Sequence, residues 1–185
     1  MRKGYSSRRY NGQMPMEQGM ELALVDAAAT EALGASLAQA FPGADRGFAV
    51  LYLEGELGAG KTTCARSLLR GLGAVGLIRS PTFTLVEDYR LGTLTCVHVD
   101  LYRLQGPVEV DELGLRDYLT PNCLLLIEWP ERGGEAVPAA DLELSLRYAN
   151  GGRRGRLKAH TALGIEWLDD LRLDNKLASY VFNLT

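Results

Sequence analysis

A glycine-rich stretch directly follows an apolar run in the first half of the chain. Residues 47–55 read GFAVLYLEG, and residues 55–62 read GELGAGKT, which fits the pattern G-x-x-x-x-G-K-[ST]. The apolar run predicts a strand buried on both faces, as in a parallel sheet flanked by helices. The residues from Lys61 to about Leu72 predict a helix. This order limits the fold, because it places a helix N-terminus at the end of a buried strand.

The glycine-rich stretch also has the composition of an anion site. Its glycines let successive backbone N–H groups point inward, and a helix N-terminus adds unpaired donors with about half a positive charge. Lys61 can bring a full charge to the β- and γ-phosphates of a nucleotide, and the Thr62 hydroxyl is placed to bind Mg²⁺. The predicted nucleotide-phosphate site comprises Leu57, Gly58, Ala59, Gly60, Lys61, Thr62 and Thr63.

Two carboxylates end apolar runs elsewhere in the chain. Asp100 ends LTCVHVD, and Glu128 ends CLLLIE. A charge in such a place is costly unless a cation or hydrogen-bond donors await it. Proteins with this phosphate-binding pattern supply a magnesium carboxylate from the end of a neighbouring strand. We therefore expect both residues near the phosphate site, although a helix cap or a surface carboxylate would also fit the pattern.

Three other residues are weaker candidates for the same site. Thr82 lies in the loop sequence RSPTFT, where a hydroxyl could sense a γ-phosphate, but such a sequence is also ordinary for a loop. Trp129 follows Glu128 and could cover the site or belong to the core or its rim. His98 lies in an apolar strand, so we interpret it as a satisfied core residue and not as a general base.

The remaining sequence predicts alternating strands and helices within one domain. Besides the run before the glycine-rich stretch, the expected strands span residues 20–25, 80–90, 94–103, 122–129, 141–149 and 153–161. The other expected helices span residues 26–41, 107–119 and 162–171. The last two strands flank an Asn-Gly turn and predict a β-hairpin. We expect a disordered leader over residues 1–20, a single domain over residues 21–172, and a loosely attached tail over residues 173–185.

Composition excludes several classes of protein. The chain has 185 residues and a net charge of −3, so charge gives no argument for nucleic-acid binding. The three cysteines are scattered through apolar stretches, which favours buried thiols in a reducing compartment over disulfides or a zinc site. No apolar run approaches the roughly 20 residues that span a membrane, and the N-terminus lacks the apolar segment of a secretory signal. We expect a cytoplasmic protein.

Five segments together resemble the bacterial TsaE family, also known as YjeE. They read GELGAGKTT, SPTFTLVEDY, HVDLYRL, LGLRDYL and LLIEWPE, and the resemblance covers about residues 22–170. It implies an α/β, P-loop NTPase-like three-layer fold, with a mostly parallel central sheet and a C-terminal antiparallel hairpin. It also implies binding and hydrolysis of ATP with Mg²⁺. The activity serves the formation of N6-threonylcarbamoyladenosine at position 37 of tRNAs that read codons starting with A.

The resemblance assigns roles to individual residues. Thr62 and Glu128 resemble the family's magnesium-binding residues, and Asp100 resembles the acidic residue that hydrolysis requires. The implied catalytic residues are Lys61, Asp100 and Thr82. The implied nucleotide contacts outside the glycine-rich stretch are Asp100, Trp129 and the NGGR turn with Gly152 and Arg153.

The resemblance also implies partners. Family members act with TsaD, which transfers the threonylcarbamoyl group, and with TsaB, which supports TsaD; tRNA is then contacted only indirectly. We expect the isolated chain to be a monomer that hydrolyses ATP slowly. A small-molecule kinase is the main alternative, and it would need an arginine-rich lid. A GTP-binding switch is disfavoured, because the sequence DNKLA lacks the aspartate that reads guanine. A nucleotide-binding scaffold without turnover is a further alternative.

Overall fold

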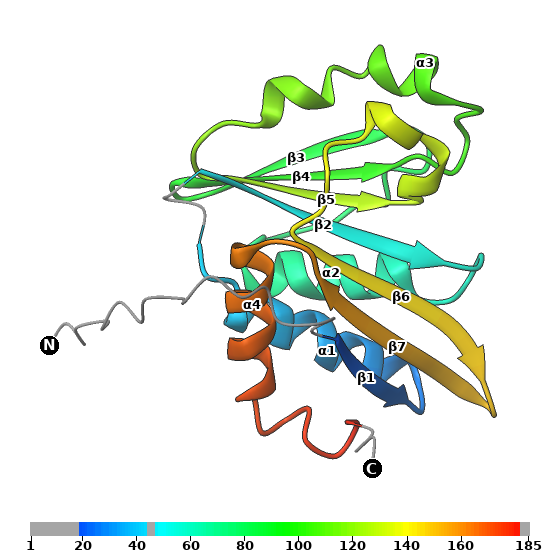
Figure 1. Cartoon of the computed structure of the whole chain (residues 1–185), viewed down its shortest axis with the longest axis vertical. Helices are drawn as coiled ribbons and strands as arrows, with labels where there is room; N and C mark the ends of the chain where they lie inside the picture. The colour runs from blue at the N-terminus through cyan, green and yellow to red at the C-terminus, as the bar shows by residue number, and fades with distance from the viewer. Residues whose placement is uncertain (1–18, 44–46, 182–185) are drawn as a thin grey trace, which may run out of the picture.

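The computed structural model describes residues 19–43 and 47–181, so most of the predicted leader lies outside the described residues. The strands are β1 (Gly19–Leu24), β2 (Phe48–Gly55), β3 (Val86–Leu91), β4 (Leu94–Asp100), β5 (Cys123–Glu128), β6 (Leu142–Ala149) and β7 (Gly152–Ala159) (Figure 1). The α-helices are α1 (Ala27–Ala40), α2 (Lys61–Gly71), α3 (Pro107–Asp111) and α4 (Ala162–Arg172). Three 3₁₀ turns span Leu115–Tyr118, Pro130–Arg132 and Gly134–Ala136.

The described strands form one seven-stranded mixed sheet in the order β1-β7-β6-β2-β5-β4-β3. Strands β6, β2, β5 and β4 are parallel to one another, as expected for the centre of the sheet. The three outer pairings, β1 with β7, β7 with β6, and β4 with β3, are antiparallel. The sheet is therefore less parallel than predicted, because β1 joins the predicted C-terminal hairpin and β3 forms a second hairpin with β4.

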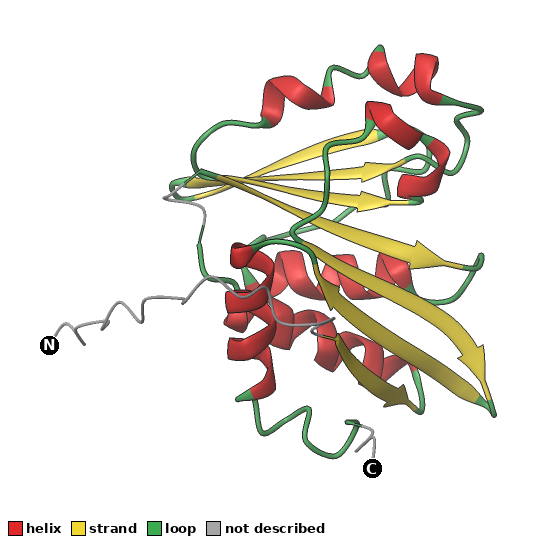
Figure 2. Ribbon diagram, viewed as in Figure 1, coloured by secondary structure: helices red, strands yellow, loops and turns green. Residues whose placement is uncertain are grey.

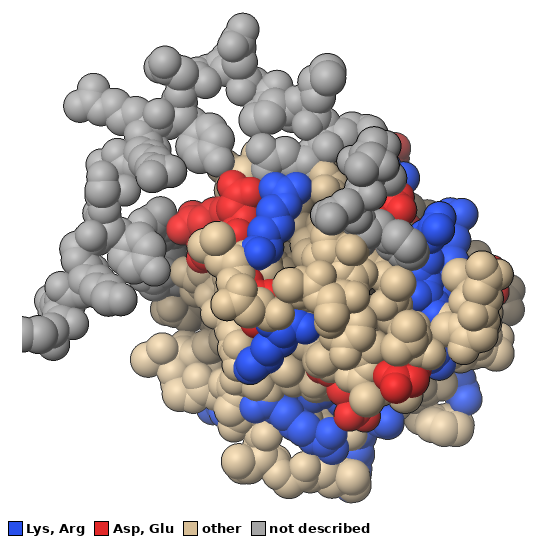
Figure 3. Space-filling model, turned by 90° about the horizontal axis from the view of Figure 1, so that it is seen from below, with Lys and Arg blue, Asp and Glu red and all other residues tan. Residues whose placement is uncertain are grey.

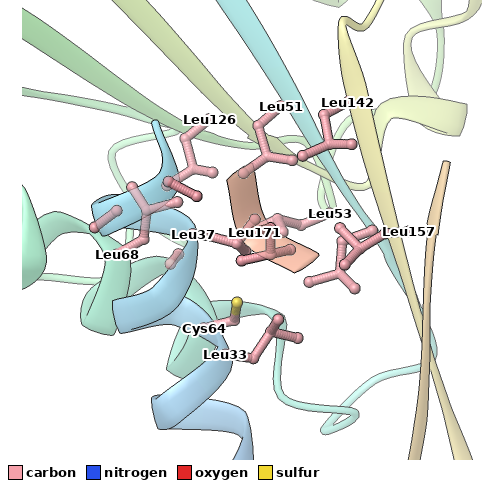
Figure 4. Packing of buried hydrophobic residues seen from close by; sticks show 14 of the residues in the cluster. Leu33, Leu37, Leu51, Leu53, Cys64, Leu68, Leu126, Leu142, Leu157 and Leu171 are labelled. Atoms are coloured by element: carbon pink, nitrogen blue, oxygen red, sulfur yellow. The ribbon is translucent and has the colours of Figure 1, made fainter. Parts of the chain in front are cut away.

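Apolar side chains cover both faces of the sheet. Alternate residues of β2 point in opposite directions, so Leu51 and Leu53 enter one core while Val50 enters the other. The first core lies between the sheet and helices α1, α2 and α4, where strand leucines meet Leu33, Leu37 and other helix residues (Figure 4). Helix α3 and the 3₁₀ turns lie over the opposite face, beside β3, β4 and β5 (Figure 2). None of the helices in the described ranges is long and apolar enough to cross a membrane.

Helix α1 fixes the position of α2. Asp26 caps α1, because its carboxylate accepts a hydrogen bond of 2.7 Å from the backbone N–H of Ala29. Farther along α1, a Cβ atom on Gly34 would overlap the carbonyl oxygen of Cys64 and lie 2.8 Å from Ser67 Cβ. The two helices therefore pack backbone to backbone. This close approach holds the first turns of α2 against the sheet.

The described part of the C-terminal tail packs onto the first core, in contrast to the loose attachment that we predicted. Leu177 is only 1% exposed. The backbone N–H of Ala23 donates to the carbonyl of Tyr180 at 2.7 Å, and Leu22 forms an isolated β-bridge with Val181. The apolar side chains of the tail explain this packing, because Leu177, Tyr180 and Val181 join the first core.

Candidate functional site

The glycine-rich loop joins the C-terminal end of β2 to the first residue of α2. Its geometry needs glycine at two positions. A Cβ atom on Gly55 would overlap the carbonyl oxygen of Leu146, so the loop leaves the sheet against the backbone of β6. Gly60, the residue before α2, has a φ of 108°, a value that residues with a side chain rarely adopt. The loop therefore curls over the N-terminus of α2, where the unpaired N–H groups of the first helical turn lie.

Lys61 bends back into this loop. Its ammonium group donates hydrogen bonds to the carbonyls of Gly55 at 2.7 Å and Glu56 at 2.9 Å, and it lies 3.7 Å from the centre of the Trp129 ring. The residue is only 4% exposed. Burial lowers the pKa of Lys61, and nearby carboxylates, that of Glu128 foremost, oppose the shift. Two of the three ammonium N–H groups are used by the loop, which leaves the third for a further acceptor.

The two predicted carboxylates lie side by side at the edge of the sheet. Asp100 and Glu128 are register partners at the ends of β4 and β5, and they are 4% and 1% exposed. Glu128 Oε2 accepts a hydrogen bond of 2.9 Å from the Thr62 hydroxyl. Asp100 Oδ2 accepts one of 3.1 Å from the Thr82 hydroxyl, and Asp100 Oδ1 accepts one of 3.0 Å from the backbone N–H of Tyr102. The structure thus brings both carboxylates to the start of α2.

A cleft of about 230 Å³ opens between these groups. It is lined by Leu57, Gly58, Gly60, Lys61, Thr62, Thr63, Thr82, Asp100, Tyr102, Glu128 and Trp129. Ala59 is fully buried and does not line it. Gly152 instead lines a separate hollow of about 410 Å³ at the turn between β6 and β7.

Three residues that join this region were not among the predicted contacts of the cleft. Tyr102 lines the cleft, and its ring packs at a tilt against Trp129 with 4.9 Å between the ring centres. The Tyr148 hydroxyl donates to the carbonyl of Leu57 at 3.1 Å. His98 Nε2 lies 2.8 Å from Glu128 Oε1, so this core histidine contacts a site carboxylate. The apolar strand around His98 predicted a core residue but gave no sign of this contact.

Arg153, which the family resemblance named with Gly152 as a nucleotide contact, approaches the glycine-rich loop. A Cβ atom on Gly60 would lie 3.3 Å from Arg153 Nε. This nitrogen is buried and has no hydrogen-bond partner in the described part of the chain. Because an unpaired buried donor costs free energy, its position beside the loop is suited to an acceptor that the protein itself does not supply.

The donor set suits a hard divalent cation together with an oxyanion. Thr62 and Glu128 offer a hydroxyl and a carboxylate, which are the oxygen ligands that Mg²⁺ prefers. No cluster of three or more His, Cys, Asp or Glu residues that could hold a metal occurs within residues 19–43 and 47–181. Mg²⁺ commonly binds through one or two carboxylates and keeps other positions for water and phosphate. The Lys61 ammonium and the helix N-terminus suit the anion.

Comparison with known proteins identifies the family. The sequence model described as "Threonylcarbamoyl adenosine biosynthesis protein TsaE" matches residues 24–156. The chain belongs to the TsaE family. The match includes the glycine-rich loop and all the residues that line the cleft. It also shows that the resemblance inferred from the sequence motifs was correct.

Individual TsaE proteins support this assignment. The tRNA threonylcarbamoyladenosine biosynthesis protein TsaE of Haemophilus influenzae is 44% identical over 115 residues, which are 62% of this chain and 73% of that protein. The protein of the same name from a Nostoc species is 37% identical over 147 residues, or 77% of this chain and 86% of that protein. The crystal structure of YdiB from Bacillus subtilis superposes with a TM-score of 0.70 at 29% identity, covering 88% of this chain and all of YdiB. The chain therefore has the α/β fold of that structure.

Proposed function

We propose that the chain binds and hydrolyses ATP with Mg²⁺, in support of the synthesis of N6-threonylcarbamoyladenosine at position 37 of tRNAs reading codons that start with A. The observation that carries the proposal is the convergence of Lys61, the Thr62–Glu128 pair and Asp100 on one cleft at the start of α2. The names of the related TsaE proteins support the tRNA part of the proposal. The fold would then be of the P-loop NTPase class.

The glycine-rich loop would hold the phosphates of the nucleotide. The unpaired backbone N–H groups at the start of α2 would donate to the phosphates, and the third N–H of the Lys61 ammonium would add a charged donor. The face of the Trp129 ring lies over the ammonium, so it limits the access of water to that group. Arg153 Nε, which is unpaired beside Gly60, would give the anion another donor from the hairpin.

The two carboxylates would take separate roles. Glu128 and Thr62 would ligate Mg²⁺, which supplies charge neutralisation of the phosphates when bound. Asp100 would orient the attacking water and accept its proton, since its side chain faces the same cleft. The Thr82 hydroxyl donates to Asp100 Oδ2, so it holds that carboxylate in place. The Ser80 hydroxyl lies 2.8 Å from that of Thr82 and extends this contact into the loop.

A partner would complete the site. Arg153 lies beside the loop, but no arginine is among the described residues that line the cleft, and this disfavours a small-molecule kinase with an arginine-rich lid. We propose slow hydrolysis by the isolated monomer in the cytoplasm and faster hydrolysis with TsaB and TsaD. The tRNA would be reached only through that complex. The face that Figure 3 shows carries both basic and acidic side chains.

The Thr82 segment would report which nucleotide is bound. Thr82 lines the cleft, whereas the neighbouring Phe83 is 81% exposed, with the Arg103 guanidinium 4.0 Å from the centre of its ring. A change at Thr82 would therefore alter the surface around Phe83. By linkage, ATP must then strengthen partner binding by the same factor by which the partner strengthens ATP binding.

Two measurements test the proposed function. ATP hydrolysis is measured for the chain alone, with and without Mg²⁺, and again with TsaB and TsaD added. Magnesium-dependent hydrolysis that rises with the partners is expected, and a chain that binds no nucleotide would refute the proposal. Partner affinity is then measured with a non-hydrolysable ATP analogue, with ADP and without nucleotide. Equal affinities in the three states would exclude the switch at Thr82.

A further inference from the structure

His98 makes a buried contact with Glu128, and the proposed hydrolysis described above gives this contact no role. It lies on β4 and is 0% exposed, with Nε2 at 2.8 Å from Glu128 Oε1. Its register partner is Leu126, two residues before Glu128, so the imidazole reaches diagonally across to the next side chain on the same face of β5. A carboxylate only accepts hydrogen bonds, so Nε2 carries the proton in this contact.

The other ring nitrogen defines the tautomer. His98 Nδ1 is buried and has no hydrogen-bond partner among the described residues. A proton on Nδ1 would leave a buried donor unpaired and would deprive Glu128 of its donor, whereas a proton on Nε2 satisfies the carboxylate. The surroundings therefore place the proton that is donated to Glu128 on Nε2.

This contact leaves one oxygen of Glu128 for the cleft. Oε1 is held by His98, while Oε2 accepts from the Thr62 hydroxyl at the start of α2. We propose that His98 is a positioning residue, which fixes the Glu128 carboxylate so that Oε2 and the Thr62 hydroxyl together face the cation. This inference rests on the proposed function, since it assigns Glu128 to Mg²⁺. Such supporting contacts typically change metal affinity about 10- to 100-fold when removed.

The first experiment compares variants by the magnesium dependence of nucleotide binding. The dissociation constant of a non-hydrolysable ATP analogue is measured by calorimetry with and without Mg²⁺, and thermal unfolding is recorded for each variant. His98→Phe keeps a ring but removes the donor, and we expect the gain in affinity from Mg²⁺ to fall by about 10-fold or more. His98→Gln restores an N–H donor and should recover most of the gain. An unchanged gain in His98→Phe would overturn the proposal, because a purely structural role would alter stability alone.

The chain contains a matched control. The Glu143 carboxylate also bridges an imidazole and a hydroxyl, with Oε2 at 2.9 Å from His160 Nε2 and Oε1 accepting from Ser145 at 3.2 Å. These residues do not line the cleft. His160→Phe should therefore leave the magnesium dependence at the wild-type value. A fall equal to that of His98→Phe would count against a specific role for His98.

A second experiment uses the wild-type chain, so it tests whether His98 Nε2 carries the proton even if His98→Phe does not fold. The chain has two histidines, and ¹⁵N-labelled imidazole signals can be assigned with a His160→Gln variant. We expect His98 as the Nε2–H tautomer before and after the Mg²⁺–nucleotide complex is added. A proton on Nδ1 alone would overturn the proposal, because Nε2 could not then donate. A wild-type chain that binds no nucleotide would refute the proposed function and not the tautomer.

Discussion

Replacing Glu128 by two different residues would separate its role in the fold from its role in binding a metal. Glu128→Gln keeps the shape of the side chain. The amide oxygen can accept from His98 Nε2, and the amide nitrogen can donate to the Thr62 hydroxyl, so both contacts of Glu128 are preserved. Glu128→Ala removes both acceptors and leaves a buried imidazole N–H without a partner, because His98 is 0% exposed.

The expected magnitudes follow from these contacts. An unpaired buried donor costs about 1–3 kcal/mol, so Glu128→Ala should lower the melting temperature by roughly 3–10 °C. Glu128→Gln should stay within about 1 kcal/mol of the wild-type stability. Both variants lose the negative charge of the carboxylate that we assign as a ligand of Mg²⁺. A hydrogen bond or contact to a charged group contributes about 1.5–3 kcal/mol, so both should weaken magnesium-dependent nucleotide binding by roughly 10- to 150-fold.

Thermal unfolding and calorimetric titration of an ATP analogue, each with and without Mg²⁺, give the two readouts. Glu143→Gln is a suitable control, because Glu143 has similar partners outside the cleft and should keep wild-type binding. Glu128→Gln with full magnesium dependence would refute the assignment of the metal to Glu128. Glu128→Gln that is as unstable as Glu128→Ala would show that the amide does not replace the two contacts.

Three further substitutions and one chemical probe test other parts of the structure. Lys61→Ala should abolish detectable ATP turnover and weaken nucleotide binding by at least about 10-fold in calorimetry, since it removes a charged donor from the loop; wild-type turnover in a folded variant would contradict this. Asp100→Ala should keep most of the nucleotide affinity but lose single-turnover hydrolysis, as expected for a group that acts in the transition state. Gly34→Ala should destabilise the chain by about 1–2 kcal/mol in urea unfolding, because overpacking against the backbone of α2 outweighs the gain in helix propensity; a more stable variant would be inconsistent with the close packing of α1 and α2. Burial raises the pKa of the Cys64 thiol from 9.0 to about 12, so this thiol should resist alkylation at pH 8 in the native chain. Above about pH 9 the unfolded chain loses the Cys64 proton first, so the free energy of unfolding should fall as the pH rises further.

The predictable parts of the site are those that local sequence determines. The glycine-rich loop and the helix that begins at Lys61 were predicted correctly, because strand, turn and helix follow one another in the chain. Asp100 and Glu128 were also expected near this loop, since each ends an apolar strand and parallel strands end at the same edge of a sheet. The assignment of ATP and Mg²⁺ to these residues stays a prediction.

The contacts that the sequence did not predict depend on how distant strands pair. The family resemblance had placed Arg153 near the nucleotide, but its approach to Gly60 depends on the hairpin of β6 and β7, whose place beside β2 cannot be derived from periodicity. Similarly, the contact of His98 with Glu128 depends on the register between β4 and β5. The C-terminal tail lacks a clear periodic pattern, so the burial of Leu177 could not be anticipated.

The pairing of β1 with β7 has a consequence for the order in which a growing chain can fold. Strand β1 is made first, but its register partners, such as Gly155 for Leu22, belong to the last strand of the sheet. The nascent chain must therefore carry an apolar β1 without its partner through most of its synthesis. Contacts between such distant segments form slowly, because a long loop must close first. Until β7 emerges from the ribosome, the open edge of β1 is a site where a chaperone, or another unfinished chain, could bind.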